Sequence, residues 1–486
     1  MILAGFDVGT TAAKGVYFDA DAGQVIAEAS WKYELHRPRE GYAEQDPADW
    51  LAGLQACRTA LDAAAPGTQL AAIGICSQVN THVFVDDRLA PVRQAISWQD
   101  QRCAGAGREL ERRAGNDLQR IFGGPFAIDA SYALSRALWL EQNEPVAWAA
   151  SRWILSPKDF CVATLTGAVR SDRVSPVGLV GADGEYLADA LALVDGAASR
   201  LPPLVEFDDC AGNTSGALGF PVGLPVSVGT MDAWSSLYGS GVVRAGQAAE
   251  ISGTSEIVGV MSGVPGSAPG VISFPPVRGR YLHAGGTQAG GDALRWIAGM
   301  LGMTVDDALA AAVAADPRPL VFLPHLAGER APLWNADARA VFVGMTSNTT
   351  PGHVVRSVLE GVAHAARHLR ECCEDAAGFR VGVLRLSGGG AQSPLWNQIR
   401  ADAHRAVLEQ VASTMTGCVG AAIMAGIAAG AGDDLEAWAA ELVTVAREFS
   451  PDPAAADRLD GLYDVYRATY RALEDQFVAL RRLAPP

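Results

Sequence analysis

The stretch that decides the fold is Phe6-Asp7-Val8-Gly9-Thr10-Thr11, because a close counterpart, Ile251-Ser252-Gly253-Thr254-Ser255, occurs about half a chain later. Each stretch ends a short apolar segment, residues 2–6 in the first case and 248–252 in the second, of the kind that forms strands. A second apolar segment follows each turn, so both stretches predict two strands joined by a turn. Two unrelated hairpin turns are the alternative, since glycine with threonine or serine is common turn chemistry.

These turns are suited to binding phosphate groups. A Gly-Thr-Thr turn between two strands exposes consecutive backbone N–H groups and two hydroxyls, a cradle for an anion that needs no net positive charge. Asp7 lies just before the turn, where it could hold a Mg2+ ion through water beside phosphate oxygens, and Lys14 is near enough to add charge. Two such turns that face each other would clamp the phosphates of one nucleotide from both sides.

The charge balance limits the kinds of partner. The 486 residues include 38 Lys and Arg against 54 Asp and Glu, a net charge of −16. This balance argues against a nucleic acid partner, because such partners require clustered basic residues. None of the three lysines, Lys14, Lys32 and Lys158, follows a glycine, so the Gly-Lys of a standard P-loop is absent. A small anionic ligand would therefore have to be held by backbone amides or a metal.

Cysteine usage and the apolar segments predict a cytoplasmic protein. The eight cysteines show no Cys-x-x-Cys spacing, which is typical of reduced, buried thiols. The chain runs from Met1 directly into an apolar strand, with no basic region or cleavage site. Its longest bland stretch, residues 419–432, is too short and too rich in small residues to span a bilayer. We therefore expect no membrane partner.

The order of the expected elements indicates an α/β protein of two domains. Short apolar strands alternate with amphipathic helices through both halves, with a long helix expected over residues 354–373. At about 150 residues per domain, the length suggests two or three domains. The repeated turn favours two, so we predict an N-terminal domain over residues 1–244 and a C-terminal domain over residues 245–486.

A glycine-rich segment of the second half, Ser387-Gly388-Gly389-Gly390, follows an expected strand and precedes a helix that begins near Pro394. Its three glycines would let a flat ligand lie against the backbone, and Asn397, one helical turn further on, could reach such a ligand. A dinucleotide-binding fingerprint is excluded because Gly-x-Gly-x-x-Gly is not completed. A flexible loop is the alternative.

Two polar segments of the first half are candidates for the chemistry itself. Asp232 follows Gly229 at the end of an expected strand, which is where a general base would be presented. The alternative is an N-cap for the following helix. Trp98, Asp100 and Arg102 combine an aromatic face with an acceptor and a donor, an inventory common in sugar sites. The alternative there is a core tryptophan beside a surface ion pair.

Taken in order, these segments resemble the FGGY family of carbohydrate kinases over nearly the whole chain. The most specific piece is Phe322-Leu323-Pro324-His325-Leu326-Ala327-Gly328-Glu329-Arg330-Ala331-Pro332. The other matching pieces are residues 6–11 with Lys14, 42–47 with Trp50, Trp98 with Asp100 and Arg102, 157–160 with 165–167, 253–255, 341–346, 356–361 and 388–390. Within the family, Glu44-Gln45-Asp46-Pro47 and the general layout are most similar to xylulose kinases.

The resemblance implies an α/β fold of the actin/hexokinase/Hsp70 ATPase type, with two ribonuclease-H-like domains and a central cleft. It implies ATP and Mg2+ as cofactors, Asp232 as the base that takes a proton from the attacking sugar hydroxyl, and Asp7 as the residue that organises Mg2+. The residues that would hold phosphates are Gly9, Thr10, Thr11, Lys14, Gly253, Thr254 and Ser255. Those that would line the adenine pocket are Gly388, Gly389, Gly390 and Asn397.

The resemblance also implies a sugar substrate, with D-xylulose converted to D-xylulose 5-phosphate. The residues expected to contact it are Gln78, Asn80, Trp98, Asp100 and Asp232. The chain departs from the xylulose kinase pattern at Ser77-Gln78-Val79-Asn80-Thr81-His82, where Met-His-Gly is usual, and at Ala233, where asparagine is frequent. The loop of residues 77–82 also lacks the Arg-Glu pair that glycerol kinases carry in it. Lost donors shift substrate preference, so another ketose or a polyol (ribulose, a tetritol or glycerol) is an alternative substrate.

A protein of a different class would have no use for these residues. A non-enzymatic actin-like ATPase module, the remaining alternative, needs no base such as Asp232 and no sugar contacts such as Trp98. A homodimer is compatible with the sequence.

Overall fold

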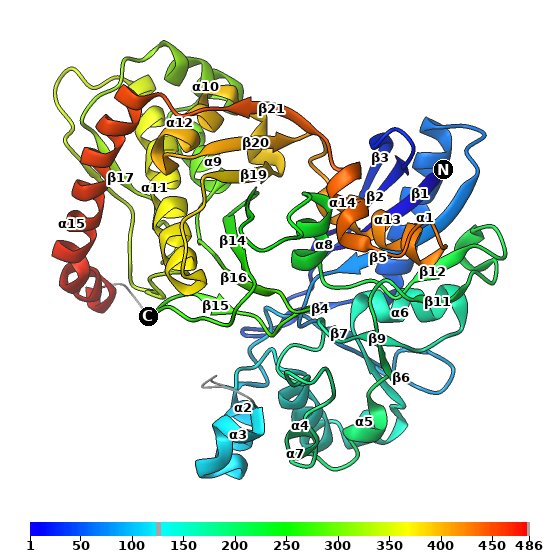
Figure 1. The fold of residues 1–486 in the computed structure, drawn as a ribbon. Coiled ribbons are helices and arrows are strands. Elements are labelled where there is room, and N and C mark those ends of the chain that lie inside the picture. The colour runs from blue at the N-terminus through cyan, green and yellow to red at the C-terminus, as the bar shows by residue number, and fades with distance from the viewer. Residues whose placement is uncertain (123–127, 484–486) are drawn as a thin grey trace. The chain divides into compact units, whose positions relative to one another are not determined.

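In the computed structural model, which describes residues 1–122 and 128–483, the chain divides into two compact units (Figure 1). Unit 1 comprises Met1–Gly241 and Met415–Val443, and unit 2 comprises Val242–Thr414 and Thr444–Pro486. The first division falls after residue 241, close to the predicted boundary after residue 244. Residues 415–443 pack with the N-terminal unit. The predicted division had a single boundary and placed these residues in the C-terminal domain.

Unit 1 is built around a six-stranded sheet with the order β11-β12-β5-β1-β2-β3. Its strands are β1 (Ile2–Val8), β2 (Ala12–Asp19), β3 (Gln24–Lys32), β5 (Leu70–Ser77), β11 (Cys210–Asn213) and β12 (Pro225–Ser227). Strands β1, β2 and β3 form an antiparallel meander, whereas β5 runs parallel to β1 and β12 runs parallel to β5. The turn of residues 9–11 therefore joins β1 to β2 within this sheet.

Unit 2 repeats this arrangement in a seven-stranded sheet of order β15-β16-β14-β13-β19-β20-β21. Its strands are β13 (Ala248–Ser252), β14 (Glu256–Ser262), β15 (Ile272–Ser273), β16 (Tyr281–Gly286), β19 (Val383–Ser387), β20 (Val407–Val411) and β21 (Val445–Phe449). Strand β13 is antiparallel to β14 and parallel to β19, as β1 is to β2 and β5. The two glycine turns thus occupy the same place in two equivalent sheets, which unrelated hairpin turns would not explain.

Helices accompany both sheets. In unit 1 they are α1 (Pro47–Ala64), α2 (Ala104–Ala114), α3 (Leu118–Phe122), α4 (Ala133–Asn143), α5 (Pro145–Ala150), α6 (Pro157–Thr166), α7 (Ala188–Leu191), α8 (Asp232–Gly239), α13 (Thr416–Ala428) and α14 (Leu435–Leu442). In unit 2 they are α9 (Gly291–Met300), α10 (Val305–Ala314), α11 (Pro351–Ala377), α12 (Pro394–His404) and α15 (Pro453–Leu483). Among the described residues no single helix is long and apolar enough to cross a membrane; α9 and α10 meet that test only as a pair, bent by 90°.

Shorter strands pair two by two. They are β4 (Glu44–Gln45) with β7 (Ala95–Ile96), β6 (Val83–Val85) with β8 (Trp153–Leu155), β9 (Ser171–Asp172) with β10 (Leu204–Val205), and β17 (Val321–Leu323) with β18 (Val341–Val343). The first three pairs belong to unit 1, and all of their strands except β4 lie between β5 and β12 in the chain.

Helix α13 packs directly on the sheet of unit 1 because glycines leave room for its backbone (Figure 1). A Cβ added to Gly5 of β1 would lie 1.9 Å from the carbonyl oxygen of Cys418, and one added to Gly74 of β5 would lie 1.8 Å from that of Ala421. Both distances are far below van der Waals contact. These close approaches explain why residues 415–443 belong to unit 1 although they come late in the chain.

Helix α1 covers the opposite face of the same sheet. Asp46 caps its N-terminus, and Trp50 and Leu54 are fully buried in a cluster that includes Phe6 of β1. Neighbouring residues of a strand point to opposite faces, so the Phe6 side faces α1 whereas the Gly5 side faces α13. The end of β1 is therefore enclosed by helices on both faces.

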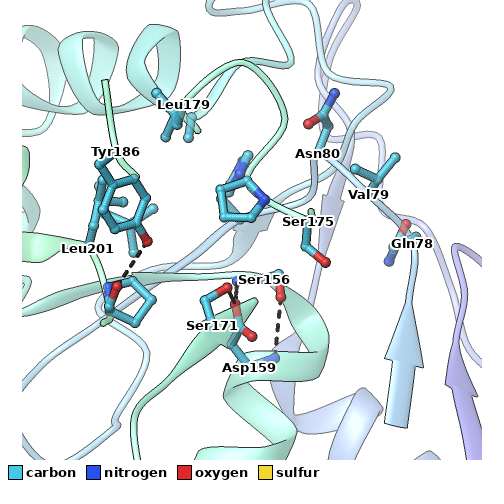
Figure 2. Close-up of a pocket in the computed structure, with 15 residues that line it drawn as sticks. Gln78, Val79, Asn80, Ser156, Asp159, Ser171, Ser175, Leu179, Tyr186 and Leu201 are labelled. Carbon is cyan, nitrogen blue, oxygen red and sulfur yellow. Dashed lines mark hydrogen bonds between the residues drawn. The ribbon is translucent and has the colours of Figure 1, made fainter. Parts of the chain in front are cut away.

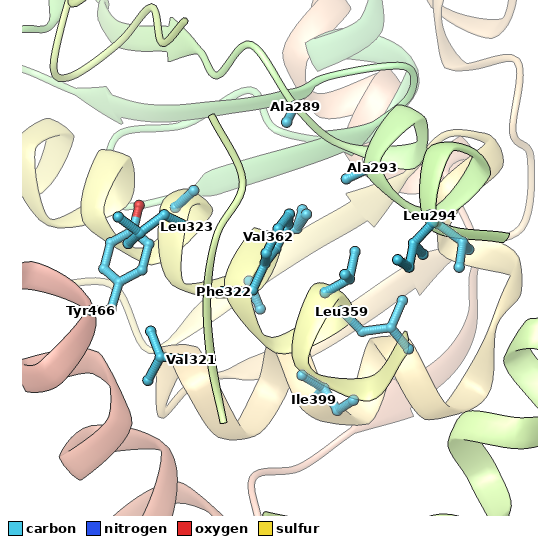
Figure 3. Close-up of a cluster of buried hydrophobic side chains, with 14 of the residues drawn as sticks. Ala289, Ala293, Leu294, Val321, Phe322, Leu323, Leu359, Val362, Ile399 and Tyr466 are labelled. Carbon is cyan, nitrogen blue, oxygen red and sulfur yellow. The ribbon is translucent and has the colours of Figure 1, made fainter. Parts of the chain in front are cut away.

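The core of unit 2 collects around α11 (Figure 3). Leu359 and Val362 of this helix are fully buried beside Phe322 of β17, Ile399 of α12 and Tyr466 of α15. Fully burying a side chain of this kind stabilises a fold by about 1.5 to 3 kcal/mol. The helix therefore fixes β17 and α12, the latter of which follows the glycine-rich segment of residues 388–390.

Candidate active site

Asp7 lies near the end of β1, and one of its carboxylate oxygens has no hydrogen-bond partner among the described residues. It is the cross-strand neighbour of the exposed Lys14 in the β1–β2 pair. Its Oδ1 is buried and has no hydrogen-bond partner among the described residues. Burial raises the pKa of the Asp7 carboxyl, and the charge of Lys14 opposes that rise. An unpartnered carboxylate oxygen at this position suits a hard cation such as Mg2+.

The glycine turn after Asp7 is held by hydrogen bonds to its carbonyl groups. Tyr33 Oη donates to the carbonyl of Gly9 at 2.6 Å, and Gln78 Nε2 donates to the same oxygen at 3.1 Å. Gln45 Nε2 donates to the carbonyl of Thr10 at 2.7 Å. Tyr33 and Gln45 were not among the candidates from the sequence, because only the folded sheet brings them to this turn.

The side chain of Thr10 joins the turn to two expected sugar contacts. Its Oγ1 donates to Gln78 Oε1 at 3.0 Å and accepts from Trp98 Nε1 at 3.0 Å. Trp98 remains 39% exposed, so it is not a core tryptophan. The structure therefore brings Gln78 and Trp98 to the first glycine turn, as one connected set of polar groups.

Asp100 accepts hydrogen bonds from the protein itself at both carboxylate oxygens. It is fully buried, and its Oδ2 accepts from the backbone N–H of Ala43 at 2.6 Å and from Arg102 Nη2 at 2.7 Å. Its Oδ1 accepts from Arg102 Nε at 2.9 Å. Both oxygens are thus engaged within the protein, where Asp100 supports the segment that carries Trp98. A direct contact between Asp100 and the sugar stays a prediction.

Asp232 is the first residue of α8 and follows the N-cap position, which Met231 occupies. It is half-buried, and its Oδ1 accepts from the backbone N–H of Ala233 at 2.7 Å. Burial, together with the negative charge of nearby Asp7, raises the pKa of Asp232 to about 7. A carboxyl whose pKa lies near neutral pH can accept and release a proton, as a general base must.

The start of α13 lies beside β1, which carries Asp7, and α8, which begins at Asp232. A Cβ added to Gly417 would lie 3.6 Å from Asp7 Oδ2 and 3.4 Å from Ser236 Oγ, one turn after Asp232 on α8. Ser235 Oγ donates to the carbonyl of Gly417 at 2.7 Å. Gly417 was not among the candidates from the sequence, because no motif near it indicates that it lies close to Asp7.

A small cavity of about 30 Å³ opens next to Gln78 (Figure 2). Its described lining residues are Gln78, Val79, Asn80, His82, Ala133, Ile154, Ser156, Asp159, Ser171, Ser175, Pro176, Leu179, Tyr186, Leu201 and Pro202, with no lysine or arginine among them. Asn80 adopts a left-handed backbone conformation (φ 55°) that asparagine tolerates well, and its Nδ2 donates to Ser131 Oγ at 3.2 Å. Burial keeps His82 neutral by lowering its pKa well below the usual range. Apart from the carboxylate of Asp159, which is paired with Lys158, the pocket thus offers uncharged hydrogen-bonding groups on an apolar wall.

The second glycine turn, in unit 2, has arginines beside its hydroxyls. Arg330 Nη2 donates to Ser255 Oγ at 3.2 Å, and Arg295 Nη2 donates to Thr254 Oγ1 at 3.4 Å. Neither arginine was assigned to this turn from the sequence, where only lysines were weighed as cations for the glycine turns. This turn therefore has positive charge available for phosphate groups in addition to its hydroxyls.

The glycine-rich segment packs closely on the end of β13. A Cβ added to Gly388 (φ 90°) would lie 2.3 Å from the carbonyl oxygen of Ser252, and one added to Gly390 would lie 2.0 Å from Ser252 Oγ. A Cβ added to Gly389, by contrast, would meet no described atom within 4 Å. Gly388 and Gly390 are therefore required by the fold itself, and Gly389 is the open position of the segment.

Asn397 holds this segment from behind. It is fully buried in α12, where its Nδ2 donates to the carbonyl of Ala391 at 2.8 Å. Arg400, one turn later, donates through Nη1 to the carbonyl of Gly390 at 3.3 Å. A direct contact between Asn397 and adenine stays a prediction, since the structure shows its amide bound to the protein.

Arg400 belongs to a fully buried ionic cluster with Glu250, Glu256 and His404. Its Nε lies 2.9 Å from Glu250 Oε1, its Nη2 lies 3.0 Å from Glu256 Oε1, and His404 Nε2 lies 2.7 Å from Glu250 Oε2. Arg400 Nη2 also donates to Ser252 Oγ at 2.7 Å. Burial raises the pKa of Glu256, against the attraction of Arg400. The cluster connects the second glycine turn to the glycine-rich segment.

Comparison with known proteins identifies the family. Residues 2–239 match the N-terminal domain, and residues 248–429 the C-terminal domain, of the FGGY family of carbohydrate kinases. Xylulose kinases from Lactococcus lactis and Escherichia coli are 28% and 30% identical to this chain, covering 96% and 98% of it and 96% and 99% of their own lengths. A gluconokinase from Bacillus licheniformis is 25% identical, covering 98% of this chain and 97% of its own length.

Solved structures agree with the architecture. A kinase from Brucella ovis described as a xyloylose kinase has a TM-score of 0.85 at 26% identity, covering 98% of this chain and 100% of its own. A xylulose kinase from Rhodospirillum rubrum has a TM-score of 0.84 at 28% identity with the same coverage. The expected fold of the actin/hexokinase/Hsp70 type is confirmed, and the chain belongs to the FGGY family of carbohydrate kinases, enzymes that phosphorylate sugars with ATP as the phosphate donor.

Proposed function

We propose that this kinase acts on a ketopentose, converting D-xylulose and ATP to D-xylulose 5-phosphate and ADP, with Asp232 as the general base. The observation that carries the proposal is the environment of Asp232. Its pKa, raised to about 7 by burial and by Asp7, lets the carboxylate accept a proton from a sugar hydroxyl at neutral pH. As that hydroxyl oxygen bonds to the γ-phosphorus and the bond to the β-phosphate oxygen breaks, the hydroxyl proton passes to Asp232.

The other residues bind and orient the reactants. Asp7 is the residue that would hold Mg2+, and its buried, unpartnered Oδ1 supports that role. When bound, Mg2+ neutralises phosphate charge during phosphoryl transfer. Thr10 and Ser255 present hydroxyls on the two glycine turns, and Arg330 adds positive charge at the second turn. Gly389 is the open backbone position against which a flat adenine ring could lie.

The pocket beside Gln78 supports an uncharged sugar over a sugar acid. Its described lining has one carboxylate, Asp159, and otherwise neutral donors and acceptors such as Gln78 and Asn80, and it contains no lysine or arginine. A carboxylate removed from water requires a cationic or multiple hydrogen-bonding partner, since burying an unpaired charge is costly. D-Gluconate, the substrate class named for one relative, carries such a carboxylate, whereas D-xylulose does not.

A coupled ADP-release assay over D-xylulose, D-ribulose, glycerol and D-gluconate tests the proposal. We expect the highest kcat/KM with D-xylulose, and a loss of about 100-fold or more in Asp232→Asn, since general bases contribute about 10²- to 10⁴-fold. The matched control is Asp87→Asn, at an exposed aspartate of the same unit, which should behave as the wild type. Preference for D-gluconate, or unchanged turnover in Asp232→Asn, would contradict the proposal.

A further inference from the structure

A buried ion cluster lies behind the candidate base in unit 1. Its members are Lys158 at the start of α6, Asp159 beside it, and Asp172 of β9, which are respectively 0%, 3% and 0% exposed. Lys158 Nζ lies 2.5 Å from Asp159 Oδ1 and 2.9 Å from Asp172 Oδ2. Burial alone would lower the pKa of Lys158, but the two carboxylates outweigh it and raise that pKa. The ammonium group is therefore charged and paired in the folded protein.

Stability by itself does not account for such a cluster. Removing charges from water costs several kcal/mol per ion, and well-packed apolar residues often serve a fold equally well. The contacts that the buried ion cluster makes with its surroundings are therefore more informative than its existence.

Two of these contacts reach the loop that leads into the base. Asp172 Oδ1 accepts from Thr230 Oγ1 at 3.1 Å, and Lys158 Nζ approaches the carbonyl oxygen of Val228 at 3.4 Å. Thr230 is fully buried and lies two residues before Asp232. A displacement of Thr230 would therefore be transmitted through one intervening residue to the carboxylate.

This loop has little freedom to adjust in any other way. Gly229 has φ 72°, and a Cβ added to it would lie 1.9 Å from the carbonyl oxygen of Ile75 in β5. Its backbone N–H donates to the carbonyl of Phe207 at 2.7 Å. One side of the loop is thus fixed by β5, and the buried ion cluster fixes the hydroxyl of Thr230.

The same cluster reaches the polar groups next to the first turn and to the pocket. The backbone N–H of Lys158 donates to Ser77 Oγ at 3.2 Å, immediately before Gln78. Asp159 Oδ2 accepts from Ser171 Oγ at 2.9 Å, and both of these residues line the pocket in Figure 2. The base loop, the Gln78 segment and the pocket wall are therefore all fastened to one set of buried charges.

We propose that the buried ion cluster sets the position of Asp232 relative to the pocket, and that Asp172 and Thr230 are positioning residues for the phosphoryl-transfer step. This inference rests on the proposed function, because it assumes that Asp232 takes the proton of the sugar hydroxyl. The charged groups of the cluster would then act without contacting the substrate, by holding Asp232 at the position of the reacting hydroxyl.

Thr230→Val is the sharpest test. Substituting Lys158 would leave two buried carboxylates unpaired and could unfold the unit, since breaking such a pair costs about 3 to 5 kcal/mol. Valine has the shape of threonine, keeps every charge in place and removes only the hydrogen bond to Asp172. Thr230→Ser restores that hydroxyl. The control is Thr214→Val, at another buried threonine of unit 1, whose Oγ1 donates to the carbonyl of Pro221 at 2.5 Å and accepts from the backbone N–H of Leu224 at 2.9 Å.

We expect Thr230→Val to lower kcat for the sugar by about 10- to 100-fold, the order expected for misplacing a reacting group by a fraction of an ångström to about 1 Å. The KM for ATP should stay within about twofold, and Thr230→Ser should recover most of the turnover. Thr214→Val should lose thermal stability comparably but keep its kcat. These results would support the proposal.

Three outcomes would contradict it, and each can be told from the others. If the wild type turns over a sugar but Thr230→Val matches Thr214→Val in kcat, the positioning role is wrong and the proposed function stands. If the wild type releases no sugar-dependent ADP, the proposed function fails and the inference fails with it. Loss of kcat in Thr230→Val that Thr230→Ser does not rescue would also reject the role of the hydroxyl.

Discussion

Replacing Arg400 by methionine should destabilise unit 2 strongly, because the change removes the one guanidinium that faces two fully buried glutamates. In the variant, Glu250 keeps its contact with His404, whereas Glu256 keeps only the hydroxyl of Ser252. Breaking a buried ion pair in this way costs about 3 to 5 kcal/mol. For a domain of this size each kcal/mol lowers Tm by about 2 to 4 °C, so the expected decrease is about 6 to 20 °C.

The pH dependence of that loss is a second, independent signature. Burial raises the pKa of Glu256 above its value in the unfolded chain, and removing Arg400 raises it further. The folded variant then binds a proton that the unfolded chain has released, so its stability falls as pH rises above the unfolded pKa. The decrease in the free energy of unfolding of Arg400→Met relative to the wild type should therefore be larger at pH 8 than at pH 6.

Calorimetry of four proteins measures both effects. Adding Glu256→Gln to Arg400→Met removes the unpaired carboxylate and should recover about 1 to 3 kcal/mol, the usual size of coupling between contacting residues. Arg405→Met is the control, since Arg405 is an exposed arginine in surface pairs with Asp457 and Asp460, and such pairs contribute little to stability. A Tm of Arg400→Met equal to that of Arg405→Met, or no recovery in the double variant, would refute the reasoning.

Two further predictions concern the reaction. The kcat/KM for the sugar should fall as pH decreases through about 7, because Asp232 gains a proton there and can no longer act as a base; a pH–rate profile that is flat between pH 5.5 and 8 would contradict this. Arg330→Met should raise the dissociation constant for ATP by about 10-fold or more, since a charge-assisted hydrogen bond contributes about 1.5 to 3 kcal/mol, with exposed Arg339→Met as the control in calorimetric titration. Equal affinities in the two variants would exclude a phosphate contact by Arg330.

Local patterns in the sequence predicted the elements that carry the two glycine turns. The alternation around residues 2–18 and 248–261 depends only on neighbouring residues, and both pairs of strands are confirmed. The long helix expected over residues 354–373 spans Pro351–Ala377 instead, because Thr350 and His353 form a capping box before it and Gly378 ends it. Capping extended the helix beyond its apolar pattern at both ends.

Contacts between distant segments could not be predicted in the same way. Helix α13 joins unit 1 through Gly5 and Gly74, and nothing in the sequence near residue 418 indicates these partners. Arg330 and Arg400 reach the second turn and the glycine-rich segment from other elements, so their charges were missed when only lysines beside the turns were considered. Tertiary structure, rather than any local motif, gives these residues their surroundings.

The most direct test of the central claim is sugar-dependent ADP release by the wild type and by Asp232→Asn at pH 8, with D-xylulose and D-gluconate compared at equal concentrations. At this pH the base should be ionised in the wild type. We predict turnover of D-xylulose by the wild type, little turnover of D-gluconate, and a decrease of about 100-fold or more in Asp232→Asn. Equal rates in the two proteins, or a wild type that turns over D-gluconate and leaves D-xylulose unchanged, would contradict the account.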